Sequence, residues 1–437
     1  MIVKIVLMFT LITIWIGLLV ALINLFGATK FWLGHATERT QLKPLKRYPT
    51  VTIVVPAHNE ELVISQTVQA ILDMAYPSDK LELLLYADNC ADNTANEMLK
   101  VVSKPEYAKQ TIKVIRRKGT GGKAGVLNDA LKIAQGEYMA VYDADAMPEE
   151  HALYFLMRKI QENPKDYVAA YGRNKTRNAQ QNFLTRCINQ EIMVTQRIRH
   201  IALWNLFGIG YIPGTNFVIL TSAMKEMGGW QNGALTEDTD LSFKLMIQGK
   251  QIALAYQSEA FQQEPEHLKD YYYQRLRWAK GNYQVVFMNF KHLFDRSHWR
   301  VKLEEVYFIS NFFWFNLAVI LSDILFLINI GVGALSLIIP GQGLVIPFTF
   351  GTNALLLYQV LLINWVLMIL LSILQVNLSL ATQFGQTNPQ QLWLALAAYF
   401  TYGQLFIAVS VHAFCSLMVD QITGRKAHWV KTKRFAD

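Results

Sequence analysis

The pattern of hydrophobic and polar positions divides the chain into a mixed central part and two strongly apolar ends. Residues Ile5–Thr29 contain no Asp, Glu, Lys or Arg, and within Val306–Val419 the only such residue is Asp323. Uncharged apolar runs of about 20 residues are long enough to cross a bilayer as helices. From about Lys30 to Arg300, apolar and charged residues mix as in an ordinary globular domain. The pattern therefore predicts a membrane protein with one large water-soluble domain.

The N-terminal run, within residues 1–29, predicts a retained membrane-spanning helix. Its 25 uncharged residues exceed the apolar core of a signal peptide, which is about 7–15 residues long. One basic residue precedes it, Lys4, and five follow closely: Lys30, Arg39, Lys43, Lys46 and Arg47. Because basic residues favour the cytoplasmic side, we expect the domain that follows, residues 30–280, to lie in the cytoplasm. Together with the apolar blocks near the C-terminus, this run predicts a multi-pass protein of the cell membrane.

The C-terminal third contains three apolar blocks: Val306–Pro340, Val345–Ala381 and Leu392–Val419. The tail that follows, residues 421–437, is basic and is also expected to be cytoplasmic, so the number of crossings must be even. We expect four crossings over residues 304–420, with two crossings and one interfacial block as the alternative. Residues 281–303 are expected to form an interfacial amphipathic segment. Asp323 is a candidate functional residue because an acid is costly within the bilayer.

Strand-like and helix-like runs alternate in the central domain. The strand-like runs are continuous apolar stretches without polar alternation: Thr50–Pro56, Leu81–Ala87, Thr111–Arg117 and Glu137–Asp143. Such strands are typical of a parallel sheet that helices cover on both faces. The sequence therefore predicts a doubly wound α/β domain, in which ligands bind beyond the carboxyl ends of the strands.

Polar residues follow each predicted strand. They are His58, Asn59 and Glu60 after the first, Asp88 after the second, the Gly-rich stretch Arg116–Gly125 after the third, and Asp143 and Asp145 after the fourth. Any one of these groups could be a helix cap or a turn. Two carboxylates one residue apart, however, direct hard oxygen ligands toward one crevice, and such ligands suit Mg²⁺ or Mn²⁺ bound to a diphosphate.

The Gly-rich stretch after the third strand fits a diphosphate without deciding which one. It fails as a Walker A loop because Arg117 and Ala124 occupy the positions that need Gly and Ser or Thr. It matches the dinucleotide fingerprint formally, but after the third strand instead of the first, which disfavours a nicotinamide or flavin enzyme. Glycines let backbone amides approach phosphate at a helix N-terminus, and Lys123 together with Arg117 adds positive charge for the phosphate.

Two later clusters each have a structural and a functional interpretation. Thr236-Glu237-Asp238 opens a predicted helix, Glu237–Gln248; it is either a capping box or a source of a general base. Gln274-Arg275-Leu276-Arg277-Trp278 lies in an aromatic, basic stretch. It is either a functional Gln-x-x-Arg-Trp motif or an interfacial helix with snorkelling Arg and anchoring Trp.

Composition excludes several other classes. Three scattered cysteines are too few for a disulfide framework or a zinc site. The formal charge of +8 is explained by basic cytoplasmic segments. No Lys/Arg run with interleaved aromatic residues is present, so we expect no nucleic-acid partner.

The motifs VPAHNE, YADNCADNT, GTGGKAG, DAD, TED and QRLRW, followed by apolar segments, together resemble the membrane-bound family 2 glycosyltransferases. The resemblance covers about Thr50 to Trp278 and is greatest to synthases of poly-N-acetylglucosamine, hyaluronan, chitin and cellulose. It implies a GT-A fold for the central domain. Two departures stand out: relatives often have two helices before the domain, and many have a second acid where this chain reads ADNC.

The resemblance also implies a role for each motif residue. It makes Asp145, with Asp143, the metal-binding pair for Mg²⁺ or Mn²⁺, and Asp238, beside Glu237, the catalytic base. The implied donor-binding residues are Asp88, Lys123, Asp143, Gln274, Arg277 and Trp278.

The function implied is inverting polymerisation of a β-linked polysaccharide from UDP-GlcNAc or UDP-glucose, coupled to translocation across the membrane. The expected partners are the UDP-sugar, the growing polysaccharide or a glycolipid acceptor, the lipid bilayer and, as a further option, a small accessory membrane subunit. Two alternatives remain open: a non-processive transferase that adds one sugar to a lipid, and a non-catalytic transporter or scaffold.

Overall fold

The computed structural model describes residues 2–35, 42, 44–294, 299–321, 324, 327, 354–385, 388–425 and 435. Asp323, residues 328–353 and residues 426–434 of the basic tail lie outside the described residues. The choice between four and two C-terminal crossings, which depends on these segments, therefore stays a prediction.

The central domain is built on an eight-stranded sheet of order β3-β2-β1-β4-β7-β6-β8-β5. Its strands are β1 Val51–Ala57, β2 Leu81–Asp88, β3 Thr111–Arg117, β4 Tyr138–Val141, β5 Met147–Pro148, β6 Tyr167–Thr176, β7 Phe217–Leu220 and β8 Gln251–Gln262. The four predicted strands are confirmed as β1–β4, which pair in parallel. The sheet as a whole is mixed, because β7 runs antiparallel to β4 and β6, while β6 and β8 pair in parallel.

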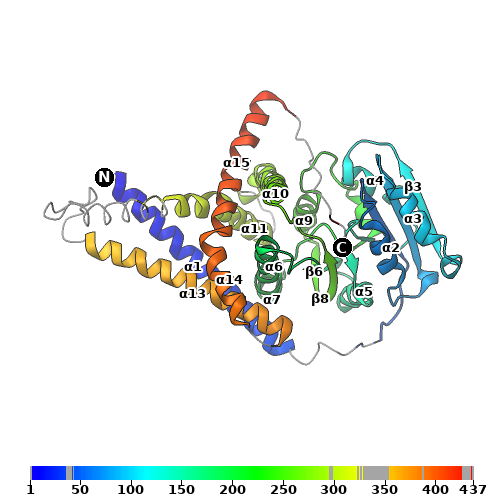
Figure 1. Cartoon of the computed structure of the whole chain (residues 1–437), viewed down its shortest axis with the longest axis horizontal. Helices are drawn as coiled ribbons and strands as arrows, with labels where there is room; N and C mark the ends of the chain where they lie inside the picture. Colours follow the sequence, from blue (N-terminus) through cyan, green and yellow to red (C-terminus); the bar gives the residue numbers. More distant parts are fainter. Residues whose placement is uncertain are drawn as a thin grey trace.

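Helices cover both faces of this sheet, as the apolar strands predict (Figure 1). They include α2 Ile64–Leu72, α3 Thr94–Val102, α4 Gly122–Ile133, α5 Ala152–Glu162, α6 Phe183–Val194, α7 Ile201–Phe207, α8 Thr221–Glu226, α9 Glu237–Ile247, α10 Leu268–Asn289 and α11 Trp299–Ile309. Successive strand residues point to opposite faces: Val54 belongs to one buried cluster, and its neighbours Ile53 and Val55 belong to the other.

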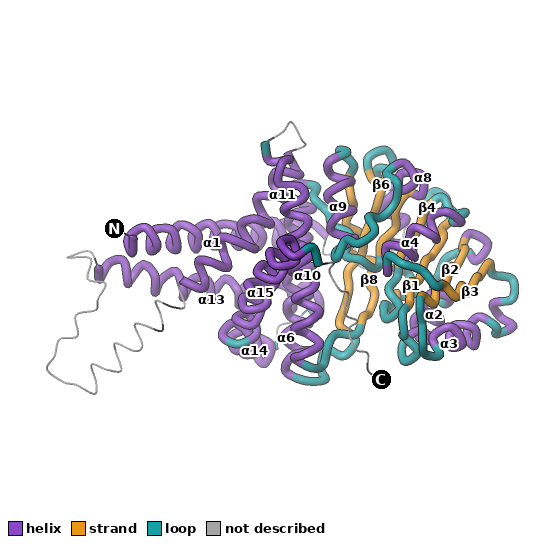
Figure 2. Tube along the Cα trace, turned by 90° about the horizontal axis from the view of Figure 1, so that it is seen from above, coloured by secondary structure: helices purple, strands orange, loops and turns teal. Residues whose placement is uncertain are grey.

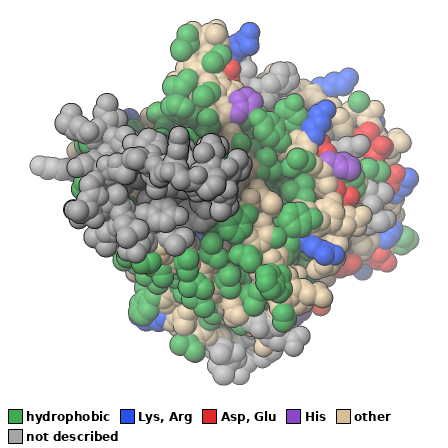
Figure 3. Space-filling view, turned by 60° about the vertical axis from the view of Figure 1, so that its left-hand side comes forward, with side chains coloured by type: hydrophobic (Ala, Val, Ile, Leu, Met, Phe, Trp, Pro, Cys, Tyr) green, Lys and Arg blue, Asp and Glu red, His purple; other side chains and the backbone are tan. Residues whose placement is uncertain are grey.

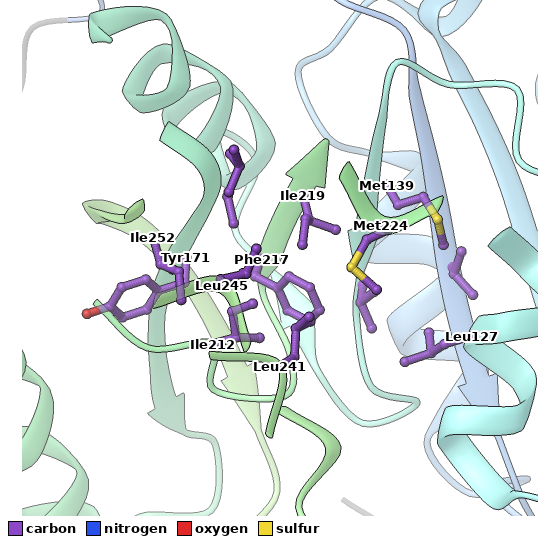
Figure 4. Packing of buried hydrophobic residues seen from close by; sticks show 14 of the residues in the cluster. Leu127, Met139, Tyr171, Ile212, Phe217, Ile219, Met224, Leu241, Leu245 and Ile252 are labelled. Carbon is purple, nitrogen blue, oxygen red and sulfur yellow. The ribbon is translucent and has the colours of Figure 1, made fainter. Parts of the chain in front are cut away.

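The first of these clusters supports the elements that carry polar residues at the sheet edge. Leu127 of α4 and Leu241 of α9 pack with Phe217 of β7 in one buried cluster (Figure 4). Leu127 lies one helical turn after Lys123, and Leu241 lies one turn after Asp238, so these contacts fix the first turns of α4 and α9.

Apolar helices extend to one side of the domain. They are α1 Ile2–His35, α13 Ala354–Phe384, α14 Pro389–Phe400 and α15 Tyr402–Thr423. Within the described residues, three stretches are long and apolar enough to cross a membrane: Met8–His35, Val366–Phe384 and Pro389–Thr423. Helices α1 and α13 lie side by side (Figure 2) and share a cluster formed by Ile14, Leu18 and Leu371.

The face formed by the apolar helices is largely hydrophobic, whereas charged side chains gather toward the domain (Figure 3). Helix α10 joins the two parts. It continues through residue 280, where we expected a domain boundary, and packs against α15 in a shared hydrophobic cluster. Lys280 of α10 pairs with Asp420, and Tyr283 hydrogen bonds with Ser410 at 2.9 Å.

Candidate active site

Four predicted site residues meet beyond the carboxyl end of β4. The Lys123 ammonium, on the first turn of α4, lies 2.6 Å from Asp143 Oδ1 and 3.3 Å from Glu237 Oε1. It also donates a hydrogen bond of 2.7 Å to the carbonyl of Gly214. A Cβ built on Gly214 would lie 2.9 Å from Asp238 Oδ2. Lys123, Asp143, Glu237 and Asp238 therefore form one cluster, which we call the acid–lysine cluster.

The backbone conformation of two segments brings this cluster together. Gly121 and Gly122, with φ of +87° and +55°, turn the chain into α4 directly before Lys123. These are left-handed values that glycine adopts readily. On the other side, Gly214 has φ of +80°, and the hydroxyl of the adjacent Thr215 accepts a 3.0 Å hydrogen bond from the Asp143 amide. The Gly214-Thr215 segment was not predicted as part of the site, although glycine after Pro213 is a common turn signal.

The interpretation of Thr236-Glu237-Asp238 as a capping box is wrong. Thr236 is the N-cap residue of α9, but its side chain makes no capping hydrogen bond. Instead, Asp238 Oδ1 accepts a 2.7 Å hydrogen bond from the amide of Thr239, and Oδ2 faces Gly214. The acids at the start of α9 therefore serve the acid–lysine cluster.

Asp238 and Lys123 differ in how the cluster shifts their pKa values. Burial and the neighbouring Glu237 carboxylate raise the pKa of Asp238 to about 7, although Lys123 opposes the rise. Burial alone would lower the pKa of Lys123, but the Asp143 and Glu237 carboxylates outweigh it and raise that pKa. Near neutral pH, Asp238 can therefore exchange a proton, while Lys123 stays a cation.

Asp145, the second acid of the DAD motif, lies against the segment that follows β8. Its side chain is buried, and Oδ2 accepts a 3.3 Å hydrogen bond from the amide of Gln263, which follows β8. Asp143 and Asp145 thus offer an oxygen-only donor set. Within the described residues, no group of three or more His, Cys, Asp or Glu side chains gathers as a metal site.

Asp88 lies at the end of β2, where it forms an ion pair with Arg117. Arg117 donates a 2.7 Å hydrogen bond to Asp88 Oδ1 and also pairs with Asp129 at 2.8 Å. The side-chain amide of Asn89 also donates to Oδ1, at 3.2 Å. The positive charge of Arg117 is therefore neutralised by Asp88 and Asp129. Lys123 is the cation of the Gly-rich stretch that points toward the acids of the acid–lysine cluster.

The Gln-x-x-Arg-Trp motif lies on α10, one turn before that helix meets α9. A Cβ on Gly281 would lie 2.5 Å from Thr236, so the two helices touch there, and Thr239 donates a 3.4 Å hydrogen bond to Asn282. The motif residues Gln274, Arg277 and Trp278 precede this contact; Gln274 is buried and the other two are partly buried. The motif is thereby placed beside the first turn of α9.

Comparison with known sequences assigns the chain to a protein family. The profile described as "Glycosyltransferase like family 2" matches residues 49–281, which is more than half of the chain. The chain belongs to glycosyltransferase family 2. A second profile, described as "Cellulose synthase", matches residues 221–401 and so includes α10 and part of the apolar helices.

Several curated proteins are similar to this family 2 chain. The "Probable glycosyltransferase YdaM" of Bacillus subtilis is 30% identical over 97% of the chain and 96% of its own length. A beta-monoglucosyldiacylglycerol synthase of Trichormus variabilis is 32% identical over 54% of the chain and 49% of its own length. The poly-beta-1,6-N-acetyl-D-glucosamine synthase of Staphylococcus epidermidis is 26% identical over 55% of the chain and 56% of its own length.

A solved structure confirms the predicted GT-A fold. The mannosyltransferase PcManGT of Pyrobaculum calidifontis, solved with GDP-Man and Mn²⁺, superposes with a TM-score of 0.53 at 18% identity, covering 82% of this chain and 98% of that one. The likeness extends to the fold alone. The α/β domain of this family 2 glycosyltransferase is therefore a GT-A domain.

Arg275, the residue after Gln274 in the motif, was not predicted to have a role. The Arg275 guanidinium lies 4.5 Å from the centre of the Trp278 ring and pairs with Glu191 of α6 at 2.7 Å. Tyr402, at the start of α15, donates its hydroxyl to the same Glu191. Arg275 therefore connects the Trp278 ring to both the domain and an apolar helix.

Gly214→Ala is expected to reduce kcat by about 10- to 100-fold, since misplacing a catalytic group by about 1 Å can cost that much. The added Cβ would lie 2.9 Å from Asp238 Oδ2. Gly228→Ala is the matched control, because Gly228 has φ of +78° but no atom within 4 Å of its Cβ position. Steady-state kinetics of both variants measure the effect; equal losses would assign it to backbone strain and not to Asp238.

Proposed function

We propose that the chain is an inverting glycosyltransferase that polymerises a β-linked polysaccharide from UDP-GlcNAc or UDP-glucose and couples synthesis to translocation. The observation that carries the proposal is the acid–lysine cluster, in which Asp238, with its raised pKa, lies across from the Asp143 strand end and Lys123. Such a cluster holds a proton acceptor and a phosphate-binding cation at one edge of the sheet.

In the proposed mechanism, Asp238 removes the proton of an acceptor hydroxyl while that oxygen attacks C1 of the donor sugar. Attack from the face opposite the leaving diphosphate inverts an α-linked donor to a β product. Lys123 and Arg277 direct positive charge at the leaving diphosphate, where negative charge develops. Asp88 contacts the nucleoside through Oδ2, the oxygen that neither Arg117 nor Asn89 uses. Gln274 and Trp278 hold the donor diphosphate together with the acceptor end.

The donor set at the DAD motif fits a divalent metal that the protein and the nucleotide hold jointly. Mg²⁺ is commonly bound through one or two carboxylates plus substrate phosphates, and Asp145 and Asp143 offer that number. We assign Asp145 as the direct ligand, because the side chain of Asp143 already pairs with Lys123. When bound, Mg²⁺ or Mn²⁺ would supply positive charge to the diphosphate.

A cavity next to the cluster supports an acceptor that reaches the site from the apolar helices. It has a volume of about 390 Å³, and its lining includes Asn282, Tyr307, Asn316, Tyr399 and Gln404. The side chain of Asn282 also accepts the hydrogen bond from Thr239, the residue after Asp238. Amide and aromatic groups are suited to sugar hydroxyls and ring faces, so a glycan entering the membrane region would meet such groups here.

The three candidate spanning helices are consistent with a membrane protein. We propose that it is a multi-pass protein of the cell membrane, with the GT-A domain in the cytoplasm where UDP-sugars are made available. The basic residues that follow the N-terminal apolar run support this orientation.

The similarity to a beta-monoglucosyldiacylglycerol synthase favours a second candidate, in which one sugar is added to a lipid. Incubating the reconstituted protein with radiolabelled UDP-GlcNAc or UDP-glucose and Mn²⁺ distinguishes the two. A ladder or high polymer supports polymerisation, and a single labelled glycolipid supports the second candidate. Absence of UDP release from any common donor would contradict both and leave the non-catalytic alternative.

The pH profile tests the assigned base. A carboxyl group with a raised pKa is protonated, and so cannot accept a proton, at pH values below that pKa. We therefore expect kcat/KM to fall about tenfold for each pH unit below about 7. Glu237→Gln removes a negative charge that raises this pKa and should shift the decline to lower pH, whereas the exposed control Glu226→Gln should not. A flat profile between pH 5.5 and 8 would contradict the assignment.

A further inference from the structure

A second cavity lies at the opposite edge of the sheet from the active site, at the end of α1. It has a volume of about 540 Å³ and lies among α1, α5, α7 and β8; we call it the juxtamembrane pocket. Strands β4, β6 and β8 run in the same direction. Tyr167 and Gln251, which line the pocket, are the first residues of β6 and β8. Asp143 and Gln263, which belong to the active-site side, come after the carboxyl ends of β4 and β8. The pocket therefore cannot belong to the donor site.

The lining of the juxtamembrane pocket carries net positive charge. Arg158 and Lys159 of α5 line it, and Glu162 is the one acid among the described lining residues, at 2.6 Å from the Lys159 ammonium. Arg300 adds charge next to the pocket: it donates a 3.0 Å hydrogen bond to the carbonyl of Phe207 and approaches Gly208, a lining residue. Anions are the ligands that such a pocket favours.

The pocket lies at the end of a candidate membrane-spanning helix, α1. On α1, Phe26 is 64% exposed and Leu33 is 78% exposed, as expected of side chains that face lipid, and the helix ends two residues later at His35. Phe31 and His35 themselves line the pocket. The exposed apolar surface of α1 therefore stops where the pocket begins.

A second spanning helix ends at the same level. The Trp32 ring lies 4.4 Å from the guanidinium carbon of Arg197, which donates a 2.9 Å hydrogen bond to Thr382 Oγ1 in the last turn of α13. The following Phe384 is 61% exposed. Two candidate spanning helices thus end at the same level, α1 at His35 and α13 at Phe384. Trp204, in the lining, is a residue type enriched at such boundaries.

We propose that the juxtamembrane pocket binds the phosphodiester headgroup of an anionic phospholipid in the leaflet next to the GT-A domain. The cations contact the phosphate, and the aromatic side chains at the end of α1 pack beside the glycerol backbone. Basic pockets at the ends of membrane helices recognise anionic headgroups by the same physics. The inference depends on α1 crossing the membrane and is independent of which sugar is transferred.

The test uses the full chain in a neutral detergent, titrated calorimetrically with dihexanoyl phosphatidylglycerol, dihexanoyl phosphatidylcholine and inorganic phosphate. We expect phosphatidylglycerol to bind more tightly than either of the others. The double variant R158Q/K159Q should weaken its binding by about tenfold or more, and E162Q, which removes the acid, should tighten it by about fivefold. K132Q, an exposed lysine of α4, is the matched control and should change nothing.

The tightening by E162Q separates a lost binding site from a misfolded protein, because misfolding cannot increase affinity. Equal binding of phosphatidylcholine and phosphatidylglycerol would overturn the role of charge. Inorganic phosphate binding as tightly as phosphatidylglycerol would assign the pocket to a soluble anion and overturn the lipid. Unchanged affinity in both R158Q/K159Q and E162Q would place the lipid elsewhere.

Discussion

Asp238→Asn is expected to lower kcat by about 10³-fold or more while the protein still binds UDP. A positioned general base typically contributes about 10²–10⁴-fold, and an amide cannot accept the proton of a sugar hydroxyl. Asn keeps the size of the side chain, and its oxygen can still accept the 2.7 Å hydrogen bond from the Thr239 amide. The folded site should therefore remain, and only the chemical step should fail. Transfer rates and UDP titrations on the same preparation measure the two properties.

Asp240→Asn is the matched control for this variant. Asp240 lies on the same turn of α9, but it is paired with Lys244 at 2.7 Å and is not part of the acid–lysine cluster. Losing that pair should cost some stability and leave kcat within about threefold, because it changes no group at the reacting atoms. If Asp238→Asn keeps full activity, or if both variants lose activity equally, Asp238 is not the base.

Lys123→Met is expected to lower kcat/KM by about 10²–10³-fold, the usual cost of removing one group that stabilises developing charge. The ammonium lies between Asp143 and Glu237, so its loss also leaves these carboxylates without a cation. Lys123 lowers the pKa of Asp238; without it that pKa should rise above 7, and the acidic limb of the pH profile should move to higher pH.

Lys132→Met provides the comparison, since Lys132 lies on the same helix with its side chain 74% exposed and pairs with Asp129. It should leave kcat/KM and the pH profile unchanged. A Lys123→Met enzyme whose affinity for UDP and whose pH profile match the wild type would contradict the assignment of Lys123 to the diphosphate.

The first half of the sheet was predictable because its strands follow one another in sequence and pair in parallel, with β1 between β2 and β4. Thr111–Arg117 has the bounds that the apolar pattern predicts, and β1, β2 and β4 differ from the predicted runs by at most two residues at either end. The second half was not predicted. Strand β7 has only four residues, Phe217–Leu220, and lies between β4 and β6. Its place depends on pairing with distant strands, which local periodicity does not report.

The candidate site was predictable to the extent that its residues end strands or begin helices. Lys123, Asp143 and Asp238 lie at such positions, and the topology brings them together. The ion pair between Asp88 and Arg117 and the stacking of Arg275 on Trp278 were not foreseen. Both depend on which side chains meet across the fold. The sequence assigned the charge of Arg117 to a phosphate, whereas the structure uses it between two carboxylates.

The central claim is that the acid–lysine cluster and the DAD motif together hold a sugar nucleotide. A structure of the full chain with UDP-GlcNAc or UDP-glucose and Mn²⁺, with anomalous data at the manganese edge, tests it most directly. We expect the manganese peak at about 2.0–2.3 Å from an Asp145 carboxylate oxygen, the diphosphate between that ion and Lys123, and C1 of the sugar facing Asp238. A nucleotide bound away from Lys123, or a sugar whose C1 faces away from Asp238, would contradict the account.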